Sequence, residues 1–223
     1  MHQRKSKIFL LYFFLLIILS SISNNFINNL KLIKIKNINI SGLEQKDNQI
    51  ILDKLKYLNL KNIFYLNKNE LVELLNSDSI IENYKVFKKY PSTINIIIQK
   101  TNFLAKINVN GKTFLIGSNG KLTPMDNYYS DLPYIFGKPN IKEFLNFKKI
   151  FEKSNFSYHQ IESLYFYPSK RWDLKLKRNI LLKLPNNFTN ENLNSIYEFI
   201  ENYDVKNFTI VDSRIKDQII LNE

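Results

Sequence analysis

An unbroken apolar run close to the start of the chain constrains its fold more than any other feature. Ile8 to Leu19 is twelve apolar residues; three basic residues precede it, and no charge follows until Lys31. As a helix the run spans about 18 Å, which is less than a hydrocarbon core of about 30 Å. Extension to Ile27 reaches that length, but only by including serine and asparagine residues.

Two interpretations of this run remain open. One is an uncleaved membrane anchor over residues 8–27 after a cytoplasmic tail of residues 1–7, and the other is a signal peptide cleaved near Ser21-Ile22-Ser23. The basic residues before the run orient the N-terminus toward the cytoplasm in both. We favour the anchor, with the lipid bilayer as its partner. The rest of the chain is then predicted to be exported to the periplasm.

Composition excludes several classes of site. The chain has no Cys and two His, which excludes disulfide scaffolds and thiolate metal sites and disfavours a histidine metal centre. The net charge of residues 31–223 is +9 and is spread without a basic block, and its nearest concentration, residues 85–90, alternates like an exposed strand. We therefore predict no metal, no cofactor and no nucleic-acid partner.

Candidate catalytic groups are few. His159 and Glu162 could share one face of a turn, and Glu70 and Glu73 could share one face of a helix. Both pairs are more often surface pairs than acid–base machinery. The five Gly form no phosphate-binding loop, and no Ser lies in a Gly-x-Ser-x-Gly elbow. The sequence predicts a non-enzymatic protein without a small-molecule substrate.

Residues 31–102 have the pattern of a compact β-α-α-β-β unit. A strand over 32–40 ends at Gly42, a residue that tolerates positive φ, and two amphipathic helices follow. The second helix is announced by Asn67 and Glu70, which have the spacing of a capping box. Two strands then flank a turn at Tyr90-Pro91. This pattern predicts two helices on one face of a three-stranded sheet.

Residues 103–223 are mostly short strands. Asn110-Gly111 is a type I′ hairpin signal, and Asn140 with Glu143 could cap a helix running to about residue 153. A second helix covers 193–200, and the last strand is predicted over 218–221. The whole chain is thus predicted to be α+β, with an N-terminal transmembrane helix, a β-α-α-β-β domain and a mainly antiparallel β domain with two helices. The last strand is either a free sheet edge or paired on both sides.

In this order of segments the chain resembles the FtsQ/DivIB family of bacterial cell-division proteins, and residues 31–102 resemble that family's polypeptide-transport-associated (POTRA) domain. The carrying motifs are Ile38-x-Ile40-x-Gly42, Val86-x-Lys88-x-Tyr90-Pro91-x-Thr93, Leu115-Ile116 with Asn119-Gly120, Leu132-Pro133 with Gly137, Arg171-Trp172-Asp173-Leu174-Lys175-Leu176, and Val211-Asp212-Ser213-Arg214. Two departures are Lys100-Thr101-x-Phe103 after the hairpin and Ser213 in place of Leu.

The resemblance implies a divisome scaffold, single-pass in the cell inner membrane at the division septum, with its bulk in the periplasm. Its partners would be the coiled-coil division proteins FtsB and FtsL together with other divisome proteins, and FtsB would add a strand to the last strand of this chain. The contact residues implied are Arg214, Ile215, Asp217, Gln218, Ile219, Ile220 and Leu221, with Lys170 and Arg171 as candidates for pairing with an acidic partner group.

Two rival hypotheses come from other classes. A POTRA-type chaperone module for exported or outer-membrane proteins would usually have repeated POTRA units or a barrel, and neither is evident in the sequence. A secreted hydrolase would need a cluster of acid, base or nucleophile, and the sequence offers none above background.

Overall fold

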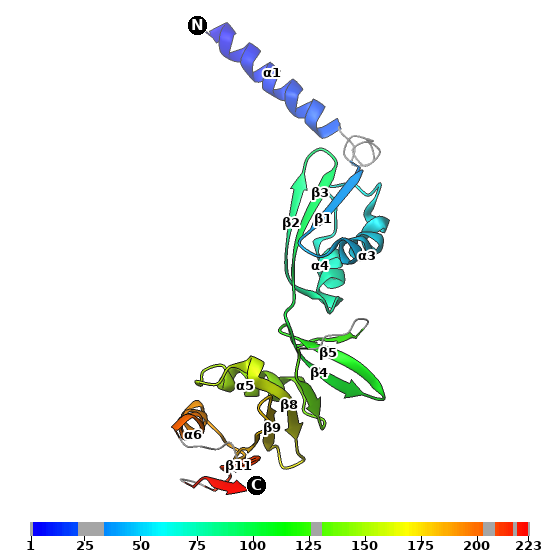
Figure 1. Cartoon of the computed structure of the whole chain (residues 1–223). Coiled ribbons are helices and arrows are strands. Elements are labelled where there is room, and N and C mark those ends of the chain that lie inside the picture. The colour runs from blue at the N-terminus through cyan, green and yellow to red at the C-terminus, as the bar shows by residue number, and fades with distance from the viewer. Residues whose placement is uncertain (1, 22–33, 126–130, 203–207, 216–217, 223) are drawn as a thin grey trace. The chain divides into compact units, whose positions relative to one another are not determined.

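The computed structural model describes residues 2–21, 34–125, 131–202, 208–215 and 218–222 (Figure 1). The chain forms two compact units: the first is Met1–Ser77 with Asn83–Lys100, and the second is Asp78–Glu82 with Thr101–Glu223. Helices and strands occur in both units, so the α+β class predicted from the sequence is confirmed.

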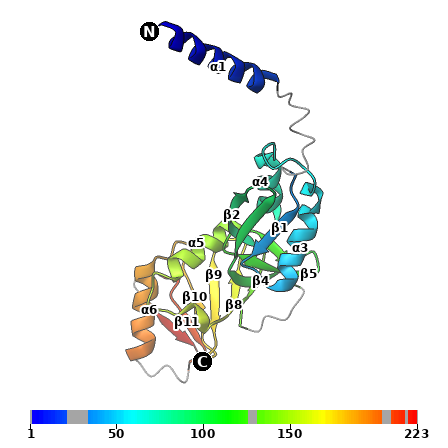
Figure 2. The ribbon, with the colours of Figure 1, turned by 90° about the horizontal axis from the view of Figure 1, so that it is seen from above.

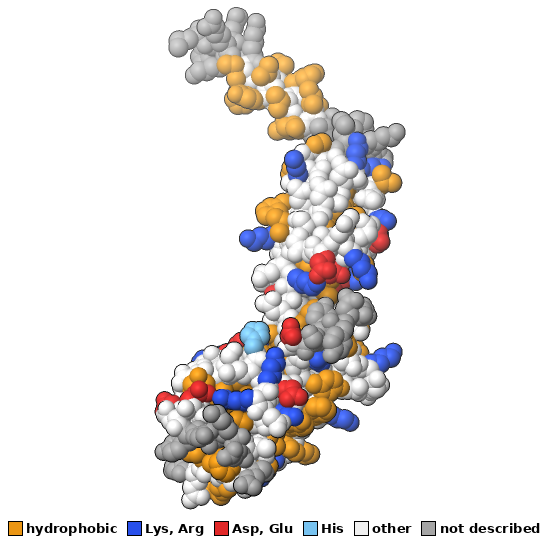
Figure 3. Space-filling model, viewed as in Figure 1, with side chains coloured by type: hydrophobic (Ala, Val, Ile, Leu, Met, Phe, Trp, Pro, Cys, Tyr) orange, Lys and Arg blue, Asp and Glu red, His pale blue; other side chains and the backbone are white. Residues whose placement is uncertain are grey.

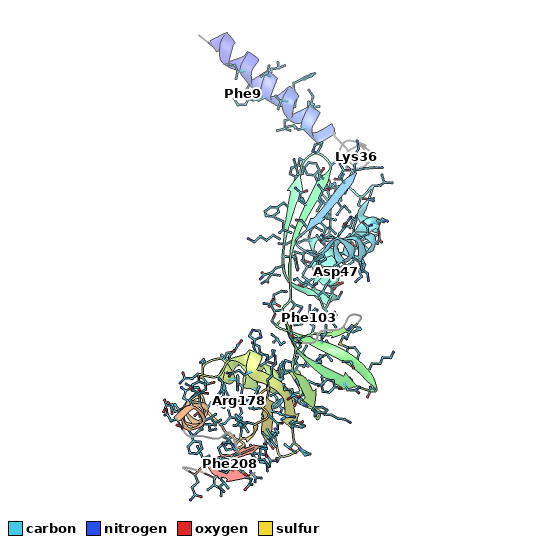
Figure 4. All side chains as sticks on the ribbon, viewed as in Figure 1. Phe9, Lys36, Asp47, Phe103, Arg178 and Phe208 are labelled. Carbon is cyan, nitrogen blue, oxygen red and sulfur yellow. The ribbon has the colours of Figure 1, made fainter. Side chains whose placement is uncertain are left out.

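The first helix, α1 (His2–Ser21), contains the apolar run. Its side chains from Ile8 to Leu19 are between 45% and 79% exposed, and Phe9 projects away from the helix in Figure 4. Within the described ranges, no helix combines the length and the apolar character needed to cross a membrane. The predicted span over residues 8–27 continues past Ser21, and residues 22–27 lie outside the described part.

The first unit continues with the predicted β-α-α-β-β order, which the structure confirms. The sheet order is β1-β3-β2, so β3 lies in the centre, and β1 runs parallel to it. The elements are β1 (Asn37–Ser41), α3 (Gln45–Leu55), the 3-10 turn η2 (Lys56–Leu58), α4 (Lys68–Ser77), β2 (Ile81–Lys89) and β3 (Thr93–Lys100).

Both helices cover one face of this small sheet (Figure 2). Alternate residues of β3, Ile94, Ile96 and Ile98, are at most 2% exposed, whereas Ile97 is 48% exposed. This period of two is expected for a strand with one buried face. The helices contribute Ile51, Leu55, Leu71 and Leu75 to the same core.

The second unit is built on a nine-stranded sheet in the order β12-β11-β10-β9-β8-β7-β4-β5-β6. Its elements are β4 (Phe103–Val109), β5 (Lys112–Gly117), β6 (Leu122–Pro124), β7 (Tyr134–Phe136), α5 (Ile141–Phe151), η3 (Tyr158–Gln160), β8 (Ile161–Phe166), β9 (Trp172–Leu176), β10 (Leu181–Lys183), α6 (Asn190–Asn202), β11 (Ile210–Asp212) and β12 (Ile220–Asn222).

Two parallel crossovers explain why one face of this sheet is covered and the other is not. The chain passes from β7 through α5 to the parallel neighbour β8, and from β10 through α6 to the parallel neighbour β11. The strands β7 and β10 point the same way because β8, β9 and β10 are successively antiparallel. Both crossovers step in the same direction along the sheet. A right-handed crossover therefore places both helices on the same face.

The covered face forms the core of the second unit. Phe144, Phe147 and Phe151 of α5 are at most 1% exposed, and the ring of Phe147 lies 4.8 Å from that of Trp172 in β9. The predicted capping box of α5 is confirmed, since the side chains and backbone N–H groups of Asn140 and Glu143 bond reciprocally. The box fixes where α5 begins, and so which face of the helix meets the sheet.

Candidate partner-binding surface

The strand β12 forms one edge of the nine-stranded sheet. It pairs antiparallel with β11, through Val211 opposite Leu221 and Asp212 opposite Ile220. Among the described residues β11 is its one hydrogen-bonded neighbour. An edge strand presents unpaired backbone N–H and C=O groups to which another strand can add. Among the described residues β12 is therefore a free sheet edge, and it is not paired on both sides.

The strand begins two residues later than predicted. The backbone N–H of Gln218 donates to the carbonyl of Ile215 over 3.3 Å, which closes a turn and keeps Gln218 out of the β11–β12 ladder. The ladder runs from Ile220 to Asn222 rather than from Gln218 to Leu221. Of the predicted contact residues, Asp217 lies outside the described part of the chain.

Side chains near this edge alternate between the two faces of the sheet. Ile219 and Leu221 pack against the core of the second unit, while Ile220 is 44% exposed on the helix-free face. The preceding turn adds Ile215, which is 53% exposed. A partner strand that paired with β12 would extend the sheet, and its side chains on each face of the sheet would therefore lie next to apolar side chains.

Arg214 is clamped to Asp212 beside the edge. Its Nε lies 2.8 Å from Oδ1 and its outer nitrogen 2.6 Å from Oδ2, while its backbone N–H donates to Oδ1 over 3.1 Å. The Asp212 side chain is 10% exposed, compared with 44% for Arg214. Hydrogen bonds from the Arg214 guanidinium hold the pKa of Asp212 below its ordinary value, and burial opposes them. The carboxylate stays charged and fixes the guanidinium on the surface.

Arg171 makes a second clamp of the same kind. Its Nε donates to Asp173 over 3.0 Å, and its guanidinium lies 4.3 Å from the ring centroid of Tyr167. The two clamps lie on the same face of the sheet, because Asp173 and Asp212 both lie opposite Lys183 of β10. The structure thus brings together two of the basic residues predicted for partner binding, Arg171 and Arg214.

Lys170 lies apart from these clamps. It has positive φ at the end of the β8–β9 turn, its side chain is 79% exposed, and its Nζ is 3.9 Å from Glu143 of α5. It borders a hollow of about 370 Å³ on the helix-covered face, with Trp172 and Phe188. The side chains of the adjacent residues Lys170 and Arg171 therefore lie on opposite faces of the sheet.

A charged row crosses the helix-free face from the clamps to the edge. Strand register places Asp173 opposite Lys183, Lys183 opposite Asp212, and Asp212 opposite Ile220. Asp173, Lys183 and Asp212 were not among the residues predicted for the site. Their signal in the sequence was an Arg and an Asp two positions apart in two segments, since that spacing places both side chains on one face of a strand.

A groove of about 680 Å³ lies on the other side of the C-terminal hairpin, against α6. Four predicted contact residues line it: Arg214, Ile215, Gln218 and Ile219. The opposite wall is polar and includes Asn192 and Ser195 of α6. The edge strand is thus bordered by a charged row on one face of the sheet and by this groove on the other.

In both of the catalytic pairs considered from the sequence, one glutamate forms an ion pair with a lysine. Glu162 pairs with Lys175 over 3.6 Å, and His159 is exposed. Glu70 pairs with Lys61 over 3.3 Å. In the part of the chain that the structure describes, no three His, Asp or Glu side chains are grouped as metal ligands.

Comparison with known families gives two matches, which together cover residues 33–214. Residues 33–100 match the family model "POTRA domain, FtsQ-type", and residues 97–214 match "Cell division protein FtsQ/DivIB, C-terminal". The chain belongs to the FtsQ/DivIB family. The POTRA match coincides with the β-α-α-β-β order of the first unit, and the second match contains both arginine clamps of the second unit.

The relatives of this FtsQ/DivIB chain include proteins named DivIB and FtsQ. A DivIB of Clostridium acetobutylicum is 39% identical over 90 residues, which are 40% of this chain and 35% of the relative. A DivIB of Clostridium botulinum (strain Hall) is 30% identical over 123 residues, 53% of this chain and 44% of the relative. The FtsQ of Rickettsia bellii is 26% identical over 160 residues, 68% of this chain and 57% of the relative. These matches span between about a third and three fifths of each relative's length.

Proposed function

We propose that this protein is a non-enzymatic scaffold of the bacterial divisome that receives a partner strand on β12. The open edge of β12 is the observation that carries the proposal. Backbone hydrogen bonds along the edge would supply affinity, and side chains on alternate sides would supply specificity. The partner we propose is FtsB, bound together with FtsL as a coiled-coil pair.

The other edge of the same sheet supports this choice of strand. The strand β6 includes Pro124, which has no backbone N–H to donate. Proline on an edge strand discourages the addition of another strand. The strand β12 consists of Ile220, Leu221 and Asn222 and has no such block.

Charge at the β12 edge favours an acidic group on the partner. Arg214 keeps 44% of its side chain exposed while Asp212 holds it in place, and Lys183 lies opposite Asp212 in the next strand. A fixed guanidinium loses little conformational entropy when it binds a carboxylate. An acidic residue of the partner strand would therefore bind at Arg214, whose rigid position makes it the specificity determinant.

Attachment to a membrane through α1 is part of the same proposal. The exposed apolar side chains from Ile8 to Leu19 support it, together with the basic residues before them. In this arrangement α1 lies in the inner membrane, and the two units lie in the periplasm at the septum. The rival function, a POTRA chaperone for exported proteins, is less supported because residues 97–214 match the cell-division C-terminal model.

The test is co-purification of the full chain with the FtsB–FtsL pair, compared with a chain that lacks residues 214–223. We expect the pair to bind the full chain and to be lost from the truncated one. Circular dichroism and a thermal melt of the truncated chain check that both units remain folded. Undiminished capture of the pair by a folded truncated chain would contradict the proposal.

A further inference from the structure

One end of the first unit carries exposed aromatic and basic side chains that its core does not use. Phe64 and Tyr90 stack with their ring centroids 4.9 Å apart, yet each is 55% exposed. Tyr65 is 56% exposed and Leu60 is 71% exposed. Large apolar side chains exposed together on a domain that already has a filled core mark an interaction surface.

Backbone hydrogen bonds hold three separate segments together at this end. The N–H of Leu60 donates to Ile35 over 3.0 Å, and the N–H of Ile35 donates to Lys61 over 2.9 Å. The N–H of Lys36 donates to Ser92, in the turn after Tyr90, over 2.8 Å. Segments 34–36, 60–65 and 90–92 therefore form one continuous surface, at the end of the unit where Figure 4 labels Lys36.

The surrounding charge is of one sign. Segments 34–36, 57–65 and 88–92 contain five lysines and no acidic residue. An acidic group next to these segments, Glu70, pairs with Lys61 over 3.3 Å. Figure 3 shows blue side chains at this end of the unit. We call this surface the aromatic–lysine tip: Leu60, Phe64, Tyr65 and Tyr90 with Lys34, Lys36, Lys61, Lys88 and Lys89.

The chain connects this tip to the apolar helix. Twelve residues, 22–33, separate Ser21 of α1 from Lys34 of the tip. Even fully extended, the thirteen peptide steps between those two residues reach no further than about 45 Å. A bilayer that holds α1 is therefore within reach of the tip. Aromatic rings and lysines together are typical of the membrane–water interface, and lysines favour anionic lipid.

We propose that the aromatic–lysine tip docks on the surface of an anionic lipid bilayer, with its aromatic side chains at the headgroup level and its lysines against lipid phosphates. This inference rests on the proposed membrane attachment of α1. It adds a second contact that fixes how the first unit meets the membrane, and it assigns a role to side chains that strand addition at β12 does not involve.

The absence of Cys from the chain makes the test direct. A single Leu60→Cys change gives the full chain one site for an environment-sensitive fluorophore, and Ile97→Cys, at a residue 48% exposed on β3 of the same unit, is the matched control. Each labelled chain is floated with vesicles of phosphatidylcholine, with or without phosphatidylglycerol. We expect a blue shift and quenching by doxyl lipid at position 60 in the anionic vesicles, and neither change at position 97.

Each outcome separates the tip from the helix. If the chain floats with anionic vesicles but position 60 behaves like position 97, the docking of the tip is refuted while attachment through α1 stands. If the chain does not float, both are refuted. An equal shift in neutral vesicles would overturn the role of anionic lipid.

A charge variant provides the second measurement. We expect Lys34→Gln with Lys36→Gln to remove most of the extra shift that phosphatidylglycerol causes at position 60. Lys153→Gln with Lys177→Gln, an equal loss of charge at exposed positions of the second unit, should leave that shift unchanged. An identical effect of both double variants would mean that net charge acts without the tip, which contradicts the proposal.

Discussion

Two glycines with positive φ differ in the space around them, so substitutions at the two positions distinguish the cost of backbone strain from the cost of steric clash. Gly42 has φ +104°, and a Cβ built there would lie 1.9 Å from the carbonyl oxygen of Ile98. Gly111, in the β4–β5 hairpin, has φ +81° and open space around the same position. The sequence indicates positive φ at both glycines, but only the folded structure shows that an added Cβ would clash at Gly42 and not at Gly111.

We expect Gly42→Ala to destabilise the first unit by about 3 kcal/mol or more, since the added methyl must displace backbone as well as adopt a strained φ. Gly111→Ala is its control and should cost about 1 kcal/mol, from φ strain alone. Denaturant unfolding of both variants measures the two free energies. Equal losses would mean that the contact with Ile98 does not decide the stability of this turn.

The clamp between Arg214 and Asp212 gives stability a predictable pH dependence. The folded-state pKa of Asp212 lies below 3.8, its ordinary value, because Arg214 donates hydrogen bonds to the carboxylate. This stabilisation is fully present above the ordinary pKa and is lost as the pH falls through the lowered one. Arg214→Gln should therefore lower the unfolding midpoint near pH 7 and have a smaller effect at about pH 2, which is below the ordinary pKa of the carboxylate.

A surface ion pair is the control for that measurement. Arg178 pairs with Glu201 over 2.9 Å, with side chains 39% and 46% exposed. Exposed pairs of this kind contribute little to stability. Arg178→Gln should therefore change the midpoint hardly at all at either pH. A pH-independent loss in Arg214→Gln would show that the side chain acts through packing rather than through the charge of Asp212.

At the β12 edge, the proposed strand addition depends on the backbone. Ile220→Pro removes the backbone N–H that pairs β12 with β11 opposite Asp212, so the edge strand should detach and binding of the FtsB–FtsL pair should be abolished. Ile220→Val keeps the backbone and most of the apolar surface, so it should bind within about threefold of the wild type. Affinity by biolayer interferometry, with a thermal melt of each variant, checks both. Strong binding by a folded Ile220→Pro chain would place the contact elsewhere.

The strands that flank α5 and α6 show where local patterns stop being informative. Short apolar runs in the sequence predict strands over 163–167, 172–176 and 180–184, and β8, β9 and β10 agree with these bounds to within two residues, since side-chain alternation is a local property. The parallel pairings of β7 with β8 and β10 with β11 join segments separated by a helix, and alternation carries no information on the direction of a partner. Because of these pairings, both described helices, α5 and α6, lie on the same face of the sheet.

The two units have separate cores, so we expect them to unfold in separate transitions. Leu75 of α4 is fully buried in the first unit, and Phe147 of α5 is 1% exposed in the second. Leu75→Ala should cost the first unit about 2–5 kcal/mol, and Phe147→Ala should cost the second about 3–5 kcal/mol. Hydrogen exchange read by mass spectrometry assigns each loss to its unit. Equal deprotection of both units by either variant would show that the chain unfolds as one.

Periodicity, capping signals and glycine positions in the linear chain were sufficient to establish the α+β class, the β-α-α-β-β unit and the start of α5, because each depends on residues only a few positions apart. Pairing across tens of residues was needed to make β12 a sheet edge, to place the Arg171 and Arg214 clamps on one face of the sheet, and to join Leu60, Phe64 and Tyr90 in one surface. Such contacts depend on which strands and turns meet when the core closes, and local sequence does not encode that choice.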